Sequence, residues 1–231
     1  QSHNQGVVLT SSSMSSAART GAGRPQATTH AAIEEAAFRL FRLRGFEETT
    51  VDDIAAAVGV GRRTLFRYFP SKNDIPWGRF DDGLSGLRSS LAAIPHDVPV
   101  LEAVHQAVLE FNRLDDDDAI EQHRQRMTLL LTTPALQAHS VLRYTQWRDV
   151  IAEYAASRYG LAGDDLLPRT IGHVSLALSL SAYEQWLREP ESRLTDLLAQ
   201  TAPLLRSYVD GAAAARPARR QRGSKGAAVR P

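Results

Sequence analysis

The sequence predicts an all-α protein, and three observations carry that prediction. Apolar residues recur at three- and four-residue intervals along most of the 231-residue chain, which is the spacing of one helix face. Start and stop signals bound these segments, as where Thr50 with Asp53 opens one and Gly59 closes it. A short arginine-rich segment over residues 62–69 ends abruptly at Pro70, which predicts a helix of about two turns.

Composition excludes several classes of protein. The chain has no cysteine, so it has neither disulfides nor thiolate metal sites, and we expect a cytoplasmic protein. The longest apolar run, residues 174–183, is about half the ~20 residues of a membrane span, so we expect no membrane partner. A serine-rich arm over residues 1–23 and a basic tail over residues 211–231 are both expected to be disordered.

Charge divides the chain into three parts. Residues 19–80 hold ten Lys and Arg against seven Asp and Glu, a net charge of +3. Residues 81–188 hold nine against fifteen, a net charge of −6, and residues 189–231 hold eight against four, a net charge of +4. A basic front and an acidic middle indicate that the front faces an anion and the middle does not.

The front of the chain predicts a helix-turn-helix. A first helix is expected from Thr28 to Arg44, and a second starts at Val51 behind the capping pair of Thr50 and Asp53. A glycine turn of a few residues then leads into the arginine-rich helix, and this spacing is typical of a helix-turn-helix. Its second helix enters a DNA major groove about 12 Å wide, for which two turns are long enough.

The stretch "GFEETTVDDIAAAVGVGRRTLFRYFPSKNDI" resembles the N-terminal domain of TetR-family transcriptional regulators. The string "GRRTLFRYFPSKNDIPWG", with "GRPQATTH" before the first helix, is similar to regulators of the mycofactocin system. The resemblance implies a homodimer in which each subunit joins a three-helix DNA-binding part, residues 24–70, to a helical ligand-binding and dimerisation part, residues 71–210. Ligand binding would alter the affinity for a palindromic operator.

The resemblance also implies DNA contacts. Thr50 would cap the second helix and touch a phosphate, and Tyr68 and Lys72 would hold phosphates. Arg62, Arg63 and Thr64 would face base edges and the backbone. Apart from the resemblance, Arg67 on the short helix and Arg24 in the arm are also expected contacts. Many relatives have a hydroxyl residue where this chain has Gly61, so a side-chain cap is expected to be missing. Arg24 reads equally well as a solvated arm residue.

For the rest of the chain, one continuous helix is expected from Ser71 to about Ala93, acting as a lever between ligand and DNA. Four adjacent carboxylates, Asp115–Asp118, cannot converge on one ion and predict a loop or a helix start rather than a metal site. His123, His139 and His173 lack the spacing of metal ligands, so neither a metal nor a cofactor is expected.

The expected effector is an amphipathic anion. An apolar cavity with one or two cations near its mouth would suit such a molecule. Lipid-responsive relatives make a fatty acyl-CoA one candidate. The expected lining residues are Leu84, Leu87, Leu91, Arg126, Met127, Tyr144 and Trp147. The last two helices resemble the family's dimer interface, with Leu178, Leu187, Leu194, Leu198 and Leu205 as its expected apolar residues, although the same residues also suit a monomer core.

Two other functions stay open at this point. An architectural DNA-binding protein without a ligand would suit the basic tail, and a transcriptional activator would use the same fold. An enzyme is not expected, because the sequence offers neither a nucleophile–base pair nor a metal constellation.

Overall fold

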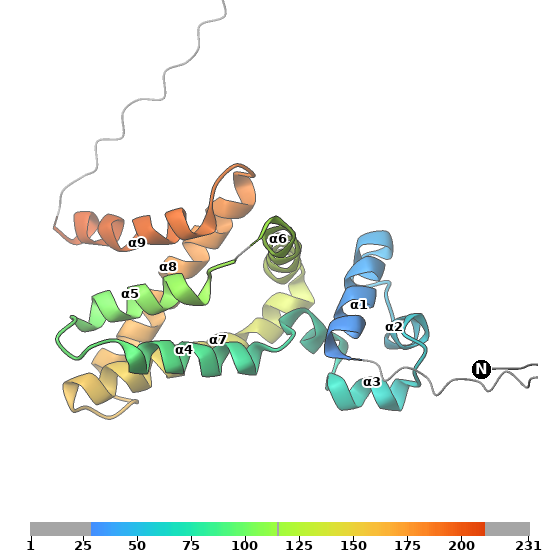
Figure 1. Ribbon diagram of the computed structural model, residues 1–231, viewed down its shortest axis with the longest axis horizontal. Helices are drawn as coiled ribbons and strands as arrows, with labels where there is room; N and C mark the ends of the chain where they lie inside the picture. The colour runs from blue at the N-terminus through green and yellow to red at the C-terminus, as the bar shows by residue number, and fades with distance from the viewer. Residues whose placement is uncertain (1–28, 115, 211–231) are drawn as a thin grey trace, which may run out of the picture.

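The computed structural model describes residues 29–114 and 116–210, and this part of the chain is helical throughout, as predicted (Figure 1). The α-helices and one 3₁₀ helix, η1, follow one another as α1 His30–Arg44, α2 Val51–Ala57, α3 Arg62–Tyr68, η1 Lys72–Trp77, α4 Phe80–Ala93, α5 Val100–Phe111, α6 Asp117–Thr132, α7 Pro134–Tyr159, α8 Leu166–Arg188 and α9 Leu194–Val209. The helices α1–α3 form a head at one end of the molecule, and α4–α9 form a larger body.

The head is held together by a small apolar core. Ile33 of α1, Ile54 of α2 and Leu65 of α3 are fully buried and meet at its centre. The predicted capping box at the start of α2 is complete: Thr50 Oγ1 accepts from the Asp53 amide, and the Asp53 carboxylate accepts from the Thr50 amide. The seven-residue helix α3 gains little stability from its own hydrogen bonds and has no side-chain cap, so packing against α1 and α2 must fix its position.

The prediction of one continuous helix from Ser71 to Ala93 is wrong. Residues 72–77 form η1, and α4 begins only at Phe80. Pro76 has no amide hydrogen to donate, and Gly78 adopts φ 55° and ψ −131°, outside the helical region. Ser71 does not cap a helix either, because its side chain accepts no hydrogen bond from a backbone amide. Its hydroxyl instead donates to Asp74 Oδ2 at 2.7 Å. The head is therefore joined to the body by a short, bent connector.

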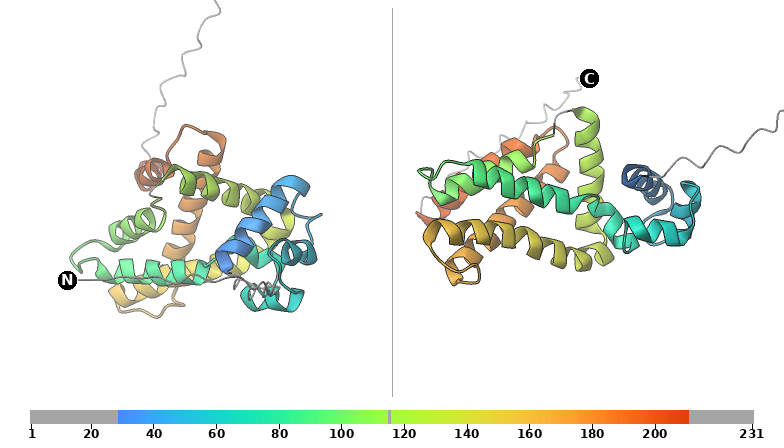
Figure 2. Two further views of the ribbon diagram at one scale, coloured as in Figure 1. Left: turned by 45° about the vertical axis from the view of Figure 1, so that its right-hand side comes forward. Right: turned by 60° about the horizontal axis from the view of Figure 1, so that its bottom comes forward.

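The body is a layered bundle in which α7 contacts helices on several sides. Figure 2 shows α4 running alongside α7, with α8 crossing behind them and α9 packed on α8. The contact between α7 and α8 is close: a Cβ added at Gly172 would lie 2.8 Å from the carbonyl oxygen of Arg148. Buried Leu87, Ile151 and Trp186 belong to the core that these helices share.

Several predictions concern parts of the chain outside the described residues, namely the N-terminal arm with Arg24, and the basic tail. Of the acidic run, Asp116 caps α6 by accepting from the Ala119 amide at 2.7 Å, so the expected helix start is confirmed. Within the described part, no helix is long and apolar enough to cross a membrane.

Candidate nucleic-acid interface and ligand cavity

The outer face of α3 is basic. Arg62, Arg63 and Arg67 are exposed, whereas Leu65 on the opposite side is buried in the head. Arg62 Nη1 donates to Asp52 of α2 at 3.1 Å, and its guanidinium lies 5.4 Å from the Phe66 ring centroid. Among the described residues, neither Arg63 nor Arg67 has a side-chain hydrogen bond or ion pair. These two guanidinium groups can therefore reach a nucleic acid without first breaking a contact.

The other predicted DNA contacts surround this helix. Thr64 and Tyr68 are half-buried on α3, and the Tyr68 ring packs edge-on against His30, with 4.9 Å between centroids. Thr50 is exposed at the start of α2, with its hydroxyl engaged in the capping box. Gly61 precedes α3 without a side-chain cap, as its lack of a side chain requires. These positions are compatible with DNA contacts, which remain a prediction.

Lys72 contacts the loop between α1 and α2. Its ammonium donates to the carbonyl oxygens of Phe46 at 2.8 Å and Thr49 at 3.1 Å, and lies 4.3 Å from the Phe46 ring centroid. A third, longer contact of 3.4 Å reaches the carbonyl of Glu47. Lys72 thus ties η1 to the loop between α1 and α2, and its contact with a phosphate stays a prediction.

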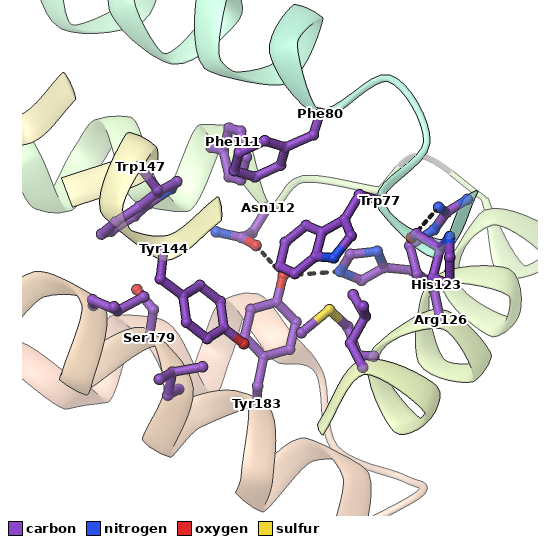
Figure 3. Close-up of a pocket in the computed structure, with 15 residues that line it drawn as sticks. Trp77, Phe80, Phe111, Asn112, His123, Arg126, Tyr144, Trp147, Ser179 and Tyr183 are labelled. Atoms are coloured by element: carbon purple, nitrogen blue, oxygen red, sulfur yellow. Dashed lines mark hydrogen bonds between the residues drawn. The ribbon is translucent and has the colours of Figure 1, made fainter. Parts of the chain in front are cut away.

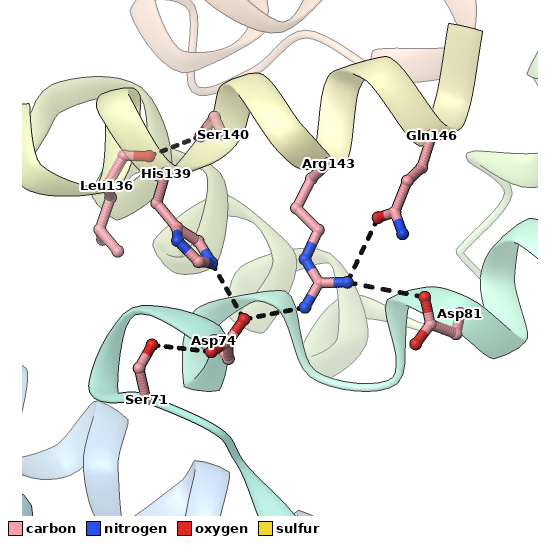
Figure 4. A network of polar contacts seen from close by, with 8 residues as sticks. All are labelled: Ser71, Asp74, Asp81, Leu136, His139, Ser140, Arg143 and Gln146. Atoms are coloured by element: carbon pink, nitrogen blue, oxygen red, sulfur yellow. Dashed lines mark hydrogen bonds and ion pairs between the residues drawn. The ribbon is translucent and has the colours of Figure 1, made fainter. Parts of the chain in front are cut away.

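Asp74 anchors the connector to the body (Figure 4). This residue is only 8% exposed, and its Oδ1 accepts from both His139 Nε2 and Arg143 Nη2 of α7 at 2.9 Å. Burial alone would raise the pKa of the Asp74 carboxyl, but hydrogen bonds from Ser71, Arg143 and His139 outweigh it and hold the pKa below its usual value. The residues that follow α3 are therefore fixed to α7 by a buried ionised carboxylate.

An apolar cavity of about 170 Å³ lies in the body beside this connector (Figure 3). Its wall is formed mainly by aromatic and aliphatic side chains from η1, α4, α5, α6, α7 and α8. The residues that line it are Pro76, Trp77, Phe80, Phe111, Asn112, His123, Arg126, Met127, Leu130, Tyr144, Trp147, Leu176, Ser179, Leu180 and Tyr183. Trp77 Nε1 and Tyr144 Oη are buried without a hydrogen-bond partner in the described structure. Two residues that line the cavity thus carry a buried donor that makes no hydrogen bond.

A hydrogen-bonded chain fixes the proton positions on one side of the cavity. Asn112 Nδ2 donates to the carbonyl of Val108 at 2.7 Å, so its Oδ1 faces Tyr183 and accepts the tyrosine's only proton. His123 Nε2, 2.9 Å from the Tyr183 oxygen, must then be the donor of that contact. Nδ1 of His123 is left as an acceptor.

The charges of these groups follow from their surroundings. Burial, aided by the charge of Arg126, lowers the pKa of His123 to about 4, so the imidazole is neutral at pH 7. Burial also raises the pKa of Tyr183 above its usual value. Arg126 is therefore the one group charged at neutral pH among the described residues that line the cavity.

The structure brings together only part of the predicted ligand-binding set. Arg126, Met127, Tyr144 and Trp147 line the cavity. Leu84, Leu87 and Leu91 do not line this cavity, and all three are buried in the core around α4. Spacing alone cannot tell a core position from a wall position on the same helix face.

Sequence reasoning missed the contribution of the connector and of α5. The lining residues Trp77, Phe80, Asn112, His123 and Tyr183 were not predicted. The signal that could have found Asn112 is an amide among the apolar residues at the end of α5, since a buried polar side chain must find a partner.

The predicted interface residues divide in the same way. Leu194 and Leu198 are 5% and 2% exposed in the single subunit and belong to its core. Leu178, Leu187 and Leu205 are half-buried. The large exposed apolar residues of the last two helices are instead Leu166, Leu167, Leu204, Tyr208 and Val209.

Comparisons with known proteins agree with this architecture. Residues 33–75 match the family of bacterial regulatory proteins, tetR family, and residues 98–210 match the MftR C-terminal domain. The chain is 44% identical over 176 residues to a Mycobacterium tuberculosis protein assigned as the mycofactocin biosynthesis transcriptional regulator MftR, covering 76% of this chain and 88% of the relative. It is 29% identical to the HTH-type transcriptional regulator TcmR of Streptomyces glaucescens, covering 70% of this chain and 74% of the relative.

Solved structures share the fold at low sequence identity. The TetR-family repressor FadR of Thermus thermophilus, solved with lauroyl-CoA, is 23% identical with a TM-score of 0.51, over 84% of this chain and all of that chain. A complex of SmeT with triclosan is 20% identical with a TM-score of 0.55, over 76% of this chain and 90% of that one. These relatives are transcriptional regulators and not enzymes. The chain belongs to the TetR family of regulators, with a C-terminal domain of the MftR type.

Proposed function

We propose that this chain is a repressor that binds a palindromic operator as a homodimer and is released by a small, largely apolar effector. The observation that carries the proposal is the exposed basic face of α3 on a head that a buried polar network ties to a body with a cavity. In this proposal residues 24–70 bind DNA, residues 71–210 bind the effector and the second subunit, and the protein acts in the cytoplasm.

The cavity wall supports an effector with an apolar body and a hydrogen-bond acceptor. Aromatic side chains form most of the wall, while Trp77 Nε1 and Tyr144 Oη need an acceptor. The lauroyl-CoA bound by the Thermus FadR and the triclosan bound by SmeT have such a chemistry. A fatty acyl-CoA is accordingly one candidate, although the cavity of about 170 Å³ would have to widen to hold a long acyl chain.

The exposed apolar residues on α9 support the homodimer. Leu204, Tyr208 and Val209 are 57%, 83% and 72% exposed, which is unusual for large apolar side chains on one helix turn after another. A two-fold interface here would place two heads on one operator. Leu204→Glu should therefore sediment as a monomer and bind the palindrome weakly, whereas Ala199→Glu on the same helix should stay dimeric. A monomeric wild-type protein that still binds the palindrome tightly would contradict the dimer.

A transcriptional activator of the same fold is the second candidate, and an architectural protein the third. The cavity favours a ligand-responsive regulator over an architectural protein, because coating DNA needs no cavity. Footprinting on the DNA upstream of the chain's own gene, with and without octanoate and lauroyl-CoA, tests the proposal. We expect a palindromic footprint that one of these ligands removes. A footprint of no defined sequence would support the architectural alternative, and loss of transcription on deletion of the protein would support the activator.

A further inference from the structure

We propose that Arg126 carries the signal from the cavity to the DNA-binding head, and that the effector bears a carboxylate or similar oxyanion that draws Arg126 away from Glu34. The inference rests on the proposed function, since it requires that the cavity binds the effector. To the proposed function it adds that the effector is negatively charged and that Arg126 senses whether the cavity is occupied.

The first support is that the Arg126 side chain belongs both to the cavity wall and to the contact between the body and the head. Arg126 lies on α6 and lines the cavity, where Figure 3 shows it beside His123. Its Nη2 donates to Glu34 Oε2 of α1 at 2.7 Å, and its Nη1 donates to the carbonyl of Pro76 in η1 at 2.6 Å. Its guanidinium also lies 5.0 Å from the ring centroid of Phe38. A cavity residue thus holds both the first helix of the head and the connector.

The second support is a cleft between α1 and α6, on the side of Arg126 that faces away from the cavity. A cleft of about 430 Å³ separates α1 from α6, and Glu34, Phe38 and Arg126 line it. Farther along the same cleft, Arg42 Nη1 donates to Gln125 Oε1 at 2.8 Å. Arg126 therefore stands between the cavity and the junction of head and body, and it is one of the two side chains of α6 that bind α1 across this cleft.

The third support is the tight packing around the ion pair. Gly78 has φ 55°, and a Cβ there would lie 2.8 Å from Glu34 Oε2 and 3.0 Å from Arg126 Nη1. Only a glycine fits both that backbone conformation and that close approach. Movement of Arg126 would also break its hydrogen bond to the Pro76 carbonyl of the connector, which carries Asp74 on the path from α3 to α7.

Charge explains why an anion in the cavity would break this arrangement. Arg126 is 26% exposed and Glu34 16%, so solvent screens the pair only in part. A ligand carboxylate reaching the guanidinium would place two negative groups on one positive group. The neutral His123 adds no second cation to compensate. A ligand carboxylate that accepts two hydrogen bonds from the guanidinium would favour release of Glu34.

The test uses octanoate and octan-1-ol, which share an apolar chain of similar length and differ in charge. Binding is followed by tryptophan fluorescence, since Trp77 and Trp147 line the cavity, and by calorimetry. We expect wild-type protein to bind octanoate at least tenfold more tightly than octan-1-ol. Glu34→Gln should bind octanoate several-fold more tightly than wild type because the competing carboxylate is gone, with octan-1-ol unchanged. Glu35→Gln, a change at the exposed residue that follows Glu34 on α1, should bind both probes as tightly as wild type does.

A second readout separates this inference from the proposed function. Affinity for the footprinted DNA is measured with and without each probe at saturation. We expect octanoate to weaken DNA binding at least fivefold in wild type and less than twofold in Glu34→Gln. If neither probe binds, or if both bind without changing DNA affinity, the effector cavity and this inference fail together. If octan-1-ol binds and releases DNA as well as octanoate, or Glu34→Gln matches wild type, the role of Arg126 is wrong and the proposed function stands.

Discussion

Arg143 of α7 donates to the buried carboxylate of Asp74 at 2.9 Å, and this ion pair fixes the segment that follows the basic helix to the centre of the body. The same arginine reaches Asp81 at 3.6 Å, but that carboxylate is 80% exposed. The position of the head thus depends on a contact shielded from water, not on the long helix that the sequence predicted.

Asp74→Asn should destabilise the protein by about 3 kcal/mol, because the change leaves Arg143 and His139 without a buried negative partner. Asp81→Asn removes the exposed partner of the same arginine and should cost less than about 0.5 kcal/mol. Urea denaturation of the two variants measures the difference. Equal effects would mean that Asp74 is not an anchor.

Arg63→Ala should weaken binding to the operator more than binding to random DNA. Arg63 is exposed on α3, and an arginine that contacts a guanine with two hydrogen bonds discriminates between bases by about 1–3 kcal/mol. Anisotropy titrations on both DNAs at one salt concentration give the ratio. An equal loss on the two DNAs would place Arg63 on the phosphates and not on base edges.

Lys72→Ala should lower the stability of the protein, whereas Arg67→Ala should weaken its binding to DNA. Lys72 binds carbonyl groups of the α1–α2 loop, so its removal should lower the free energy of unfolding by about 1–2 kcal/mol. Arg67 is exposed, and its removal should leave stability within about 0.5 kcal/mol while lowering the salt slope of DNA binding by about one. A stable Lys72→Ala variant with a reduced salt slope would restore the original phosphate assignment.

The free energy of unfolding should fall as the pH is lowered, because His123 is buried in its neutral form. Its pKa is about 4 in the folded protein and about 6.5 when unfolded, so between those values only the unfolded chain takes up the proton. The loss should begin below about pH 6.5 and reach about 3 kcal/mol near pH 4. His123→Gln should flatten the difference between pH 7 and pH 4.5 in urea denaturation, whereas His96→Gln, at an exposed site, should not. Parallel curves for wild type and His123→Gln would exclude this assignment.

The sequence predicted most of the head because its signals are local. Thr50 and Asp53 cap α2 through residues three apart, and the apolar residues of α1 and α2 face one small core. The connector was mispredicted because helix-like spacing continues through it, while Pro76 and Gly78 act on the backbone without disturbing that spacing. A proline and a glycine so close together were the available signal.

The cavity was predicted only in part because its wall comes from segments far apart in sequence. Tyr144 and Trp147 share a helix and were predicted together, but Asn112 and Tyr183 meet only after α5 and α8 have packed. The role of Lys72 depended likewise on a loop more than twenty residues away. Spacing along one helix carries no information about contacts of this kind.

The measurement that tests the central claim most directly is the affinity for octanoate, by calorimetry, with and without saturating operator DNA. A coupling between cavity and head must be reciprocal, so a ligand that weakens DNA binding must itself be bound more weakly in the DNA complex, by the same factor. We expect a loss of at least fivefold, equal within error to the effect of octanoate on DNA affinity. Equal octanoate affinities in the presence and absence of operator would contradict the account.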